Sequence, residues 1–218
     1  MGLLGNILVT FALIFWPMVW IVSIMGMGGP GASNNLSWML QLLLFNSYPI
    51  WIFAVLSYTG STYWGLNSHY FLLGIAALFL VLNVGLIYSV YNLVVRGINN
   101  EGYSVAGDTV YWNASLMPEA DSGTFQPILK RLAIDQNHFY DSGRVLDIVA
   151  DPASFRHIEE LYYRDNEHIF YVPYYEVRLV EEAEVESFEV ITETNNDVTS
   201  DARDAHFRYY SGEKVAPR

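Results

Sequence analysis

The stretch LLGNILVTFALIFWPMVWIVSIMGM, residues Leu3–Met27, decides the fold of the first part of the chain because it holds no charged side chain. An α-helix rises about 1.5 Å per residue, so about 20 apolar residues are enough to cross a ~30 Å hydrocarbon core. The stretch is longer than that. It therefore predicts a membrane-spanning helix.

The same composition continues well beyond this first run. Residues 1–95 contain no Lys, Arg, Asp or Glu, whereas all 11 basic and all 23 acidic side chains lie from Arg96 onward. A soluble surface needs charged residues, so we expect this part of the chain to face lipid. Two further apolar runs, Leu36–Tyr58 and Tyr70–Val95, are also long enough to span. The sequence predicts a three-helix transmembrane region over residues 1–96 and an acidic domain over residues 97–218.

A cleaved signal peptide is the alternative for the first run. No basic residue precedes the run, it is too long for the apolar part of a signal peptide, and no Ala-x-Ala site follows it. We expect it to be retained.

Arg96 is the only Lys or Arg close to a predicted span, so orientation depends on it alone. By the positive-inside rule it favours a cytoplasmic C-terminal domain. A periplasmic domain stays open, because an interfacial Arg can reach lipid phosphate on either side.

The predicted spans contain a few polar residues, chiefly Asn46, Ser47 and Asn83, with kinks expected at Pro17 and Pro49. Transporters usually keep ionisable groups inside the bilayer, and these runs have none. We expect the polar residues to join helices through hydrogen bonds. The alternative is that the stretch around Asn46 lines a polar cavity, as broken helices do in transporters.

Beyond Arg96, a short motif recurs three times with the pattern A-[DE]-x-x-[ST]-F. Its copies are Ala120–Phe125, Ala150–Phe155 and Ala183–Phe188. A second element, a polar turn followed by aromatic or β-branched residues, precedes each copy and begins at Ala106, Asp135 and Asp165. A further one begins at Asp204 and is interpreted as a unit cut short by the terminus. Such internal repetition predicts a repeat architecture.

Each repeat unit is expected to be a β-hairpin, as in YDSGRVL over residues 140–146. The motif acid should cap a tight turn and the motif Phe should enter the core. Because one unit cannot bury its apolar face alone, consecutive units should form one continuous sheet or a short solenoid. The predicted fold class is a membrane α-helical bundle of three transmembrane helices plus a mainly-β repeat domain of hairpin units. The predicted structural repeat positions are Asp121, Phe125, Asp135, Tyr140, Asp151, Phe155, Asp165 and Phe188.

The stretch Asp135-Gln-Asn-His-Phe-Tyr140, with the Ser-Gly-Arg-Val and Ala-Asp-Pro-Ala-Ser-Phe that follow, resembles the DKNYY family, named for its repeated Asp-Lys-Asn-Tyr-Tyr pattern. The resemblance covers about residues 103–215. The chain departs from the pattern where Ala106 replaces the first Asp and where the third unit carries Val-Pro-Tyr in place of Ser-Gly. The resemblance implies a bacterial repeat domain without established catalysis, often envelope-associated, and hence a plasma (inner) membrane location; it supplies no active residues.

Motifs for chemistry are lacking in the sequence. It has no nucleophile elbow, zinc-protease motif, P-loop or dinucleotide fingerprint, and no cysteine. Asp135–Asp141 begins like a calcium loop but has Phe139 at its fifth position, and His138 and His168 lack a third metal ligand. We expect no enzyme, no cofactor and no metal site. A net charge of −12 disfavours nucleic-acid binding.

The segment Glu181–Asp197 holds seven acidic residues and no basic one. It is either a solvated face or a docking surface for a basic partner, with Glu181, Glu182, Glu184 and Glu186 as the candidate docking residues. The sequence thus predicts a membrane-anchored, non-catalytic protein-binding or scaffold module. Its partners would be membrane lipid and another protein, basic or membrane-embedded. A narrower form is an immunity-type protein that neutralises a toxin at the membrane; the alternative is an accessory subunit of a transporter or channel complex.

Overall fold

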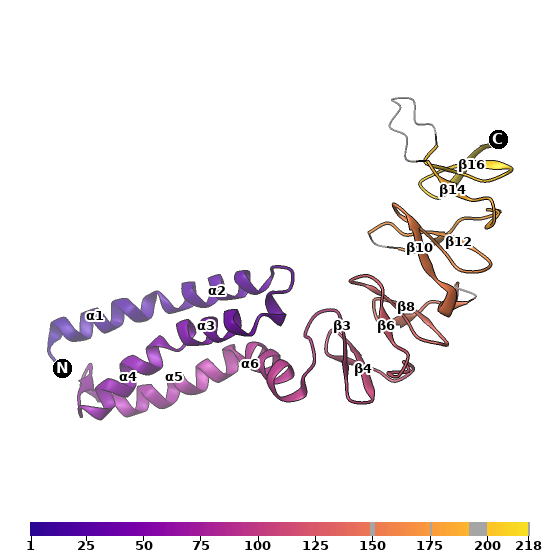
Figure 1. Cartoon of the computed structure of the whole chain (residues 1–218). Coiled ribbons are helices and arrows are strands. Elements are labelled where there is room, and N and C mark those ends of the chain that lie inside the picture. The colour runs from indigo at the N-terminus through magenta and orange to yellow at the C-terminus, as the bar shows by residue number, and fades with distance from the viewer. Residues whose placement is uncertain (149–150, 175, 192–199, 218) are drawn as a thin grey trace. The chain divides into compact units, whose positions relative to one another are not determined.

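The computed structural model describes residues 1–148, 151–174, 176–191 and 200–217, which form two compact units (Figure 1). Met1–Glu101 are mainly helical, and Gly102–Arg218 are built from strands. The boundary between the units follows Glu101, so the predicted boundary at 96/97 lies inside the helical unit.

The first apolar run forms one helix. α1 (Leu3–Ile14) and α2 (Trp16–Met27) are continuous across Phe15 and make a 25-residue helix, long and apolar enough to cross a membrane. Pro17 lies in the first turn of α2, and the helix continues past it.

The second and third apolar runs are each broken into two helices. α3 (Leu36–Asn46) and α4 (Tyr48–Tyr58) meet at 47°. α5 (Ser68–Leu82) meets α6 (Val84–Tyr91) and its π-helical continuation η2 (Asn92–Arg96) at 64°. By length and composition, the described residues therefore provide one membrane-crossing helix, or three if each bent pair crosses as a single span.

The break between α3 and α4 has a clear local cause. Pro49, in the first turn of α4, has no N–H to continue the hydrogen-bond ladder, as its predicted kink requires. The break at Asn83 has no proline, so no comparable local signal predicts it. The connectors between the runs contain the short helix η1 (Ala32–Asn34) and a hairpin of β1 (Thr62–Tyr63) and β2 (Leu66–Asn67).

The first connector holds the segment that follows the third run. Asn34 Oδ1 accepts hydrogen bonds from the backbone N–H groups of Asn100 (2.7 Å) and Glu101 (3.1 Å). The Glu101 carboxylate in turn accepts from Gly31 N–H (2.8 Å) and the Ser33 hydroxyl (3.0 Å). Residues 97–101 are therefore tied to the helices, which places the end of the helical unit at Glu101.

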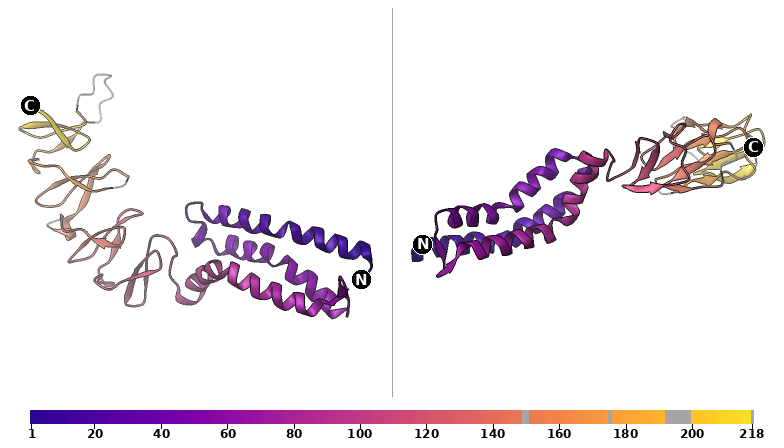
Figure 2. Two further views of the ribbon diagram at one scale, coloured as in Figure 1. Left: turned by 180° about the vertical axis from the view of Figure 1, so that it is seen from behind. Right: turned by 90° about the horizontal axis from the view of Figure 1, so that it is seen from below.

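The second unit contains four small antiparallel sheets that follow one another in chain order (Figures 1 and 2). The first sheet has strands β3 (Tyr103–Ala106), β4 (Thr109–Trp112) and β5 (Ser115–Met117). The second has β6 (Gln126–Pro127), β7 (Leu132–Ile134), β8 (Phe139–Asp141) and β9 (Arg144–Val145). The third, preceded by η3 (Pro152–Ser154), has β10 (Arg156–Glu159), β11 (Tyr162–Arg164), β12 (Ile169–Tyr171) and β13 (Arg178–Leu179). The fourth has β14 (Glu189–Val190), β15 (Ala202–Arg203), β16 (Phe207–Tyr210) and β17 (Glu213–Pro217).

The hydrophobic core of this unit lies between successive sheets. Successive side chains of a strand point to opposite faces, and in β8 and β12 both faces are buried. Tyr140 packs with the first sheet and its neighbour Phe139 with the third. Likewise, Phe170 packs with the second sheet and Ile169 with the fourth. In β16 the outward position carries the exposed Arg208, which gives the last sheet a polar outer face.

The mainly-β prediction is confirmed, and the structure refines how the repeat is built. The four sheets are hydrogen-bonded separately over the described ranges, so the units stack instead of forming one continuous sheet. Each A-[DE]-x-x-[ST]-F motif is joined to the Asp turn that follows it, not to the one that precedes it. The turn at Asp204 therefore completes a four-strand unit that begins at Ala183, and is not the start of a truncated one.

Candidate functional site

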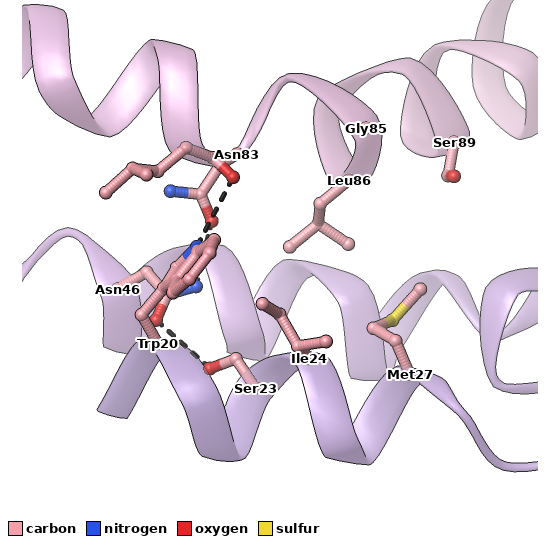
Figure 3. Close-up of a pocket in the computed structure, with 10 residues that line it drawn as sticks. Trp20, Ser23, Ile24, Met27, Asn46, Asn83, Gly85, Leu86 and Ser89 are labelled. Atoms are coloured by element: carbon pink, nitrogen blue, oxygen red, sulfur yellow. Dashed lines mark hydrogen bonds between the residues drawn. The ribbon is translucent and has the colours of Figure 1, made fainter. Parts of the chain in front are cut away.

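A buried polar cluster lies where the bent helix pairs break (Figure 3). Asn46, the last residue of α3, donates from Nδ2 to Oδ1 of Asn83, which sits between α5 and α6 (2.8 Å). Ser23 of α2 donates to Asn46 Oδ1 (3.0 Å). All three side chains are at least nine-tenths buried. Side-chain amides and hydroxyls are common joints between helices in membranes, so this cluster ties the three apolar runs together.

Two tryptophans satisfy backbone carbonyls at the breaks. Near Pro49, the N–H of Ile50 donates to Ser47 O (2.9 Å), and the carbonyl of Asn46 instead accepts from Trp16 Nε1 (2.8 Å). At the other break, Trp20 Nε1 donates to the carbonyl of Leu82 (3.3 Å). Broken helices persist in apolar surroundings only when neighbouring groups take over the freed carbonyls.

A cavity of about 340 Å³ adjoins this cluster, between α2 and the end of α5 with α6 (Figure 3). Ten residues line it, and none is charged: Trp20, Ser23, Ile24, Met27, Asn46, Leu82, Asn83, Gly85, Leu86 and Ser89. Such a lining can bind an apolar body and offer a few hydrogen bonds. It holds no group that titrates near neutral pH and could move a proton.

In the strand unit, the recurring polar residue is a buried aspartate. Asp135, Asp165 and Asp204 are at most 2% exposed. One oxygen of each accepts two backbone N–H groups of its own turn, at 2.6–2.8 Å. The other oxygen accepts the N–H of the preceding motif's acid, at 2.9 Å from Asp121, 3.4 Å from Asp151 and 2.9 Å from Glu184. The aspartate therefore joins the two halves of each unit.

The hydroxyl of each motif makes a second link between the same two segments. Thr124, Ser154 and Ser187 each accept a hydrogen bond from the backbone N–H of the residue after the buried aspartate, at 3.1, 3.0 and 2.9 Å. This explains why the motif requires Ser or Thr at that position, because both have a hydroxyl on a short side chain.

Burial and hydrogen bonding oppose each other at two of these carboxylates, Asp135 and Asp204. Burial disfavours the charged form of Asp135, but hydrogen bonds from Asp121 N–H, the Tyr140 hydroxyl and the turn amides hold its pKa below the usual value. Hydrogen bonds likewise hold the pKa of Asp204 below normal against burial. Burial, reinforced by the adjacent carboxylates, raises the pKa of the Tyr140 and Tyr209 hydroxyls. Asp135 and Asp204 therefore stay ionised acceptors, which suits a structural role.

The structure places the predicted motif residues in separate cores. Phe125 packs between the first and second sheets and Phe155 between the second and third, and both are buried. Phe188 packs between the third and fourth sheets but is only half-buried. Among the motif acids, Asp121 accepts from Gly123 N–H (3.1 Å) as a turn cap, whereas Asp151 accepts from the Asn166 amide (2.8 Å).

The acidic segment is partly used within the fourth unit. Glu181, Glu182, Glu184 and Glu186 are all exposed. Glu182 forms an ion pair with Lys214, and Glu184 accepts from the Ser187 hydroxyl. Residues 192–199, which contain the segment's last two acids, and Ala150 of the second motif lie outside the described residues.

A second, larger hollow lies between the second and third sheets, with a volume of about 490 Å³. We call it the groove; it is lined by Trp112, Leu129, Lys130, Arg131, Leu161, Tyr163, Val172, Pro173 and Tyr174. Leu129, Leu161 and Tyr174 are exposed, and Tyr174 is 85% exposed. A cluster of large apolar side chains at a surface is typical of an interaction site.

The groove occurs at the one junction, among those described, that departs from the repeat. At the first junction Gly143 packs so closely on Trp112 that a Cβ would lie 2.5 Å from Cγ, and its N–H donates to the Tyr103 hydroxyl (3.1 Å). At the third junction Gly212 packs on Tyr171 in the same way and donates to the Tyr162 hydroxyl (3.0 Å). Both glycines also have positive φ, which favours glycine.

Among the described residues of the middle junction, none of these groups is present. Strand pairing shows that Leu132 and Asp141 stand where the other junctions have Tyr103 with Trp112 and Tyr162 with Tyr171. The Val172–Tyr174 loop replaces the Ser-Gly turn. Arg131 holds this loop by donating to the carbonyls of Pro173 and Glu176, and it also pairs with Asp141. The loop is therefore fixed without a turn packed against an aromatic ring, and the groove is left beside it.

The part of the chain that the structure describes has no cluster of three or more His, Asp or Glu side chains able to hold a metal. Each of His138 and His168 lies beside the buried aspartate of its own turn, at 3.5 and 3.7 Å.

Sequence reasoning missed both the buried aspartates as hydrogen-bond centres and the groove. The signal for the first was present, because Asp135 and Asp165 each follow a motif acid by 14 residues. The only sequence signal for the groove was Val-Pro-Tyr in the third unit, at the place where Ser-Gly was expected.

Comparison with known proteins finds a family model that matches the middle of the chain. Residues 87–173 match the model of the DKNYY family, which confirms the resemblance from about residue 103 to residue 173. The matched stretch includes the end of the helical unit and the strands up to β12. No curated protein and no solved structure matches the chain.

Proposed function

We propose, from the premise that residues 87–173 belong to the DKNYY family, that this chain is a membrane-anchored, non-catalytic module that binds another protein. The observation that carries the proposal is the groove. Its lining is apolar or aromatic except for Lys130 and Arg131, it is partly exposed, and it lies at the junction whose packing differs from that of the other two.

The anchoring role is supported by one helix that can cross a membrane, or by three spans if each bent pair crosses as one. The first run is a 25-residue apolar helix, and the two bent pairs have the length and composition to cross as single spans. The Asn46–Asn83 hydrogen bond and the tryptophan bonds at the breaks would hold such bent spans together in lipid. The protein would then be multi-pass, in the plasma (inner) membrane of a bacterium, with the strand unit on the cytoplasmic side that Arg96 favours.

The chemistry of the partner follows from charge and from the groove lining. Arg96 and Glu101 are the only charged side chains of the helical unit and cancel, so the net charge of −12 belongs to the strand unit. Such a field attracts a basic protein. The groove itself has two cations, Lys130 and Arg131, and no acid among its described lining residues, so it would take an apolar or aromatic side chain while the acidic surface outside it attracts the partner's basic residues. An immunity-type protein that neutralises a cationic toxin would be one case.

The test is capture of the partner by the tagged full-length protein in mild detergent, followed by mass spectrometry. Replacing Leu129 and Tyr174 together by Ser removes apolar surface from the groove and leaves Arg131 in place. We expect this double variant to recover at least tenfold less of the partner. Leu116→Ser is the matched control, because Leu116 is 55% exposed on the first sheet and does not line the groove.

Equal recovery of every associated protein by the double variant and the control would refute docking in the groove. The alternative function, an accessory subunit of a transporter or channel complex, is favoured by the polar cluster and cavity among the helices. It predicts membrane proteins whose recovery depends on the helical unit and not on the groove.

A further inference from the structure

We propose that the cavity between α2 and α6 binds a neutral single-chain lipid, whose hydrocarbon fills the cavity and whose hydroxyl or ester oxygen meets the Asn46–Asn83 pair. This inference rests on the proposed membrane placement of the helical unit and is independent of the groove. It concerns a ligand site in the anchor, beyond the protein-binding role.

The size and walls of the cavity suit a small apolar ligand. Its volume of about 340 Å³ falls at the lower end of the range of ~300–1,000 Å³ typical of ligand pockets. Most of its walls are hydrocarbon or indole, from Trp20, Ile24, Met27, Leu82 and Leu86. Gly85 adds no side chain, and a Cβ built on it would have no neighbour within 4 Å.

The polar end of the cavity has hydrogen-bond capacity to offer. An asparagine amide carries two N–H groups. Within the described structure, Asn46 Nδ2 donates to Asn83 Oδ1 (2.8 Å), and Asn83 Nδ2 donates to the carbonyl of Phe79 (2.9 Å). Each amide therefore has one N–H left for a ligand. In hydrocarbon an unused donor costs free energy, and an acceptor oxygen removes that cost.

Charge decides the class of lipid. None of the ten lining residues is charged, so an ionised head group would find no counter-ion there. A phosphate or carboxylate in such surroundings is strongly disfavoured. A neutral hydroxyl or ester satisfies the amides without this penalty. Figure 3 shows Asn46 and Asn83 at one end of the cavity and Leu86, Ile24, Met27 and Ser89 further along it.

The probe is dodecanol carrying a diazirine near the end of its chain, added to the full-length protein in lipid nanodiscs and crosslinked by light. We expect labelled peptides from residues 20–27 and 82–89. Gly85→Leu should fill the cavity and lower this labelling at least fivefold. Gly74→Leu is the matched control, because Gly74 is also an exposed glycine of a helix with open space around it but lies outside the cavity.

Competition on the wild-type protein tests the polar contact without any variant. Excess unlabelled dodecanol should reduce the labelling at least fivefold, whereas dodecane, which has the same chain and no oxygen, should not. Equal competition by both, or equal labelling of wild type and Gly85→Leu, would overturn the proposal. Absence of labelling, together with loss of a membrane protein partner from Gly85→Leu, would also overturn the proposal, since a partner helix would then fill the cavity. Release of the chain from membranes by alkaline carbonate would instead refute the membrane placement.

Discussion

At the scale of single residues, the three buried aspartates accept equivalent backbone hydrogen bonds, and two of them also accept one from a tyrosine hydroxyl. Asp135 and Asp204 each accept a hydrogen bond from a tyrosine hydroxyl five residues on, Tyr140 and Tyr209, at 2.7 Å. Asp165 has Phe170 at that position. The protein therefore contains its own comparison of a buried carboxylate with and without this hydroxyl.

Tyr140→Phe should convert the second unit to the arrangement of the third. The change removes one hydrogen bond to a charged acceptor and keeps the ring in the core, so we expect a loss of about 1.5–3 kcal/mol in the free energy of unfolding. Tyr209→Phe should cost a similar amount. Urea denaturation of residues 102–218, which form one compact unit, measures both. Tyr210→Phe is the control, because Tyr210 is half exposed, and a loss there as large as for Tyr140→Phe would contradict the assignment.

The lowered pKa values of Asp135 and Asp204 predict acid sensitivity of the strand unit. A carboxyl whose pKa is lower when folded binds fewer protons in the folded state, so folding is favoured more as pH rises through that window. The contribution is complete above the unfolded value of about 3.9 and is lost as pH falls through the folded pKa. The urea concentration at the denaturation midpoint should therefore decrease as the pH is lowered from 5 to 2.5.

The double variant Asp135→Asn, Asp204→Asn identifies the groups responsible. Its stability at pH 5 should be lower, because each amide nitrogen faces the N–H of Asp121 or Glu184, which is also a donor. Its midpoint should change less with pH than that of the wild type. An unchanged pH dependence would assign the acid sensitivity to other carboxylates.

What could be predicted at this scale was the type of residue and not its role. The polar turns were recognised from Asp135 and Asp165, yet burial of a carboxylate depends on whether enough donors converge on it, and most of those donors are backbone N–H groups. The sequence alone does not show which backbone N–H groups come together in the folded chain. The convergence of Asp121 N–H and the Asp135 turn amides is a product of the folded chain.

At the scale of elements, the motif phenylalanines should not be equal in energy. Phe155 contacts the rings of Phe139, Tyr163 and Phe170 at centroid distances of 4.6–5.5 Å. Phe155→Ala should therefore cost roughly 3–5 kcal/mol, and Phe125→Ala a similar amount. Phe188→Ala should cost less because Phe188 is half-buried. Thermal melts of residues 102–218 measure the differences, with the exposed Glu186→Ala as control; a Phe155→Ala shift no larger than the control's would contradict the packing.

The elements were predictable where one local signal dominates. The charge-free runs predicted the helical stretches, and Pro49 predicted the break between α3 and α4. The break at Asn83 depends on partners from other helices, Asn46 and Trp20, so no local signal marked it. In the strand unit, the period of two gave strands, but whether they join one sheet or several depends on the connections. The motif turns lead the chain from one sheet to the next, so the described strands on either side of a motif do not pair with each other.

At the scale of the whole molecule, orientation depends on very little charge. Arg96 is the only basic residue of the helical unit, and it donates to the hydroxyl of Tyr88 (3.2 Å) and to Asn92 Oδ1 (3.0 Å). If it acts as a positive-inside signal, the strand unit is cytoplasmic. Protease added to intact spheroplasts should then leave residues 102–218 uncut, and should cut them after the membrane is opened. Cleavage in sealed spheroplasts would reverse the orientation.

The acidic surface and the groove should act at different stages of binding. Charge steers the encounter and mainly sets the association rate, whereas a buried apolar anchor mainly sets dissociation. Replacing Glu181, Glu182, Glu184 and Glu186 by Gln removes four charges at nearly constant volume. We expect the fold to persist, because the structural bond of Glu184 to Asp204 uses its backbone N–H and the Glu182–Lys214 pair is exposed.

With the captured partner, association of this fourfold variant should be about tenfold slower at low salt. The difference from wild type should shrink at ~0.15 M salt, where charges separated by more than ~8 Å are screened. The Leu129→Ser, Tyr174→Ser variant should show the opposite pattern, with faster dissociation and nearly unchanged association. An association rate that the glutamate substitutions leave unchanged at low salt would mean that the segment is a solvated face, and the groove alone would then account for recognition.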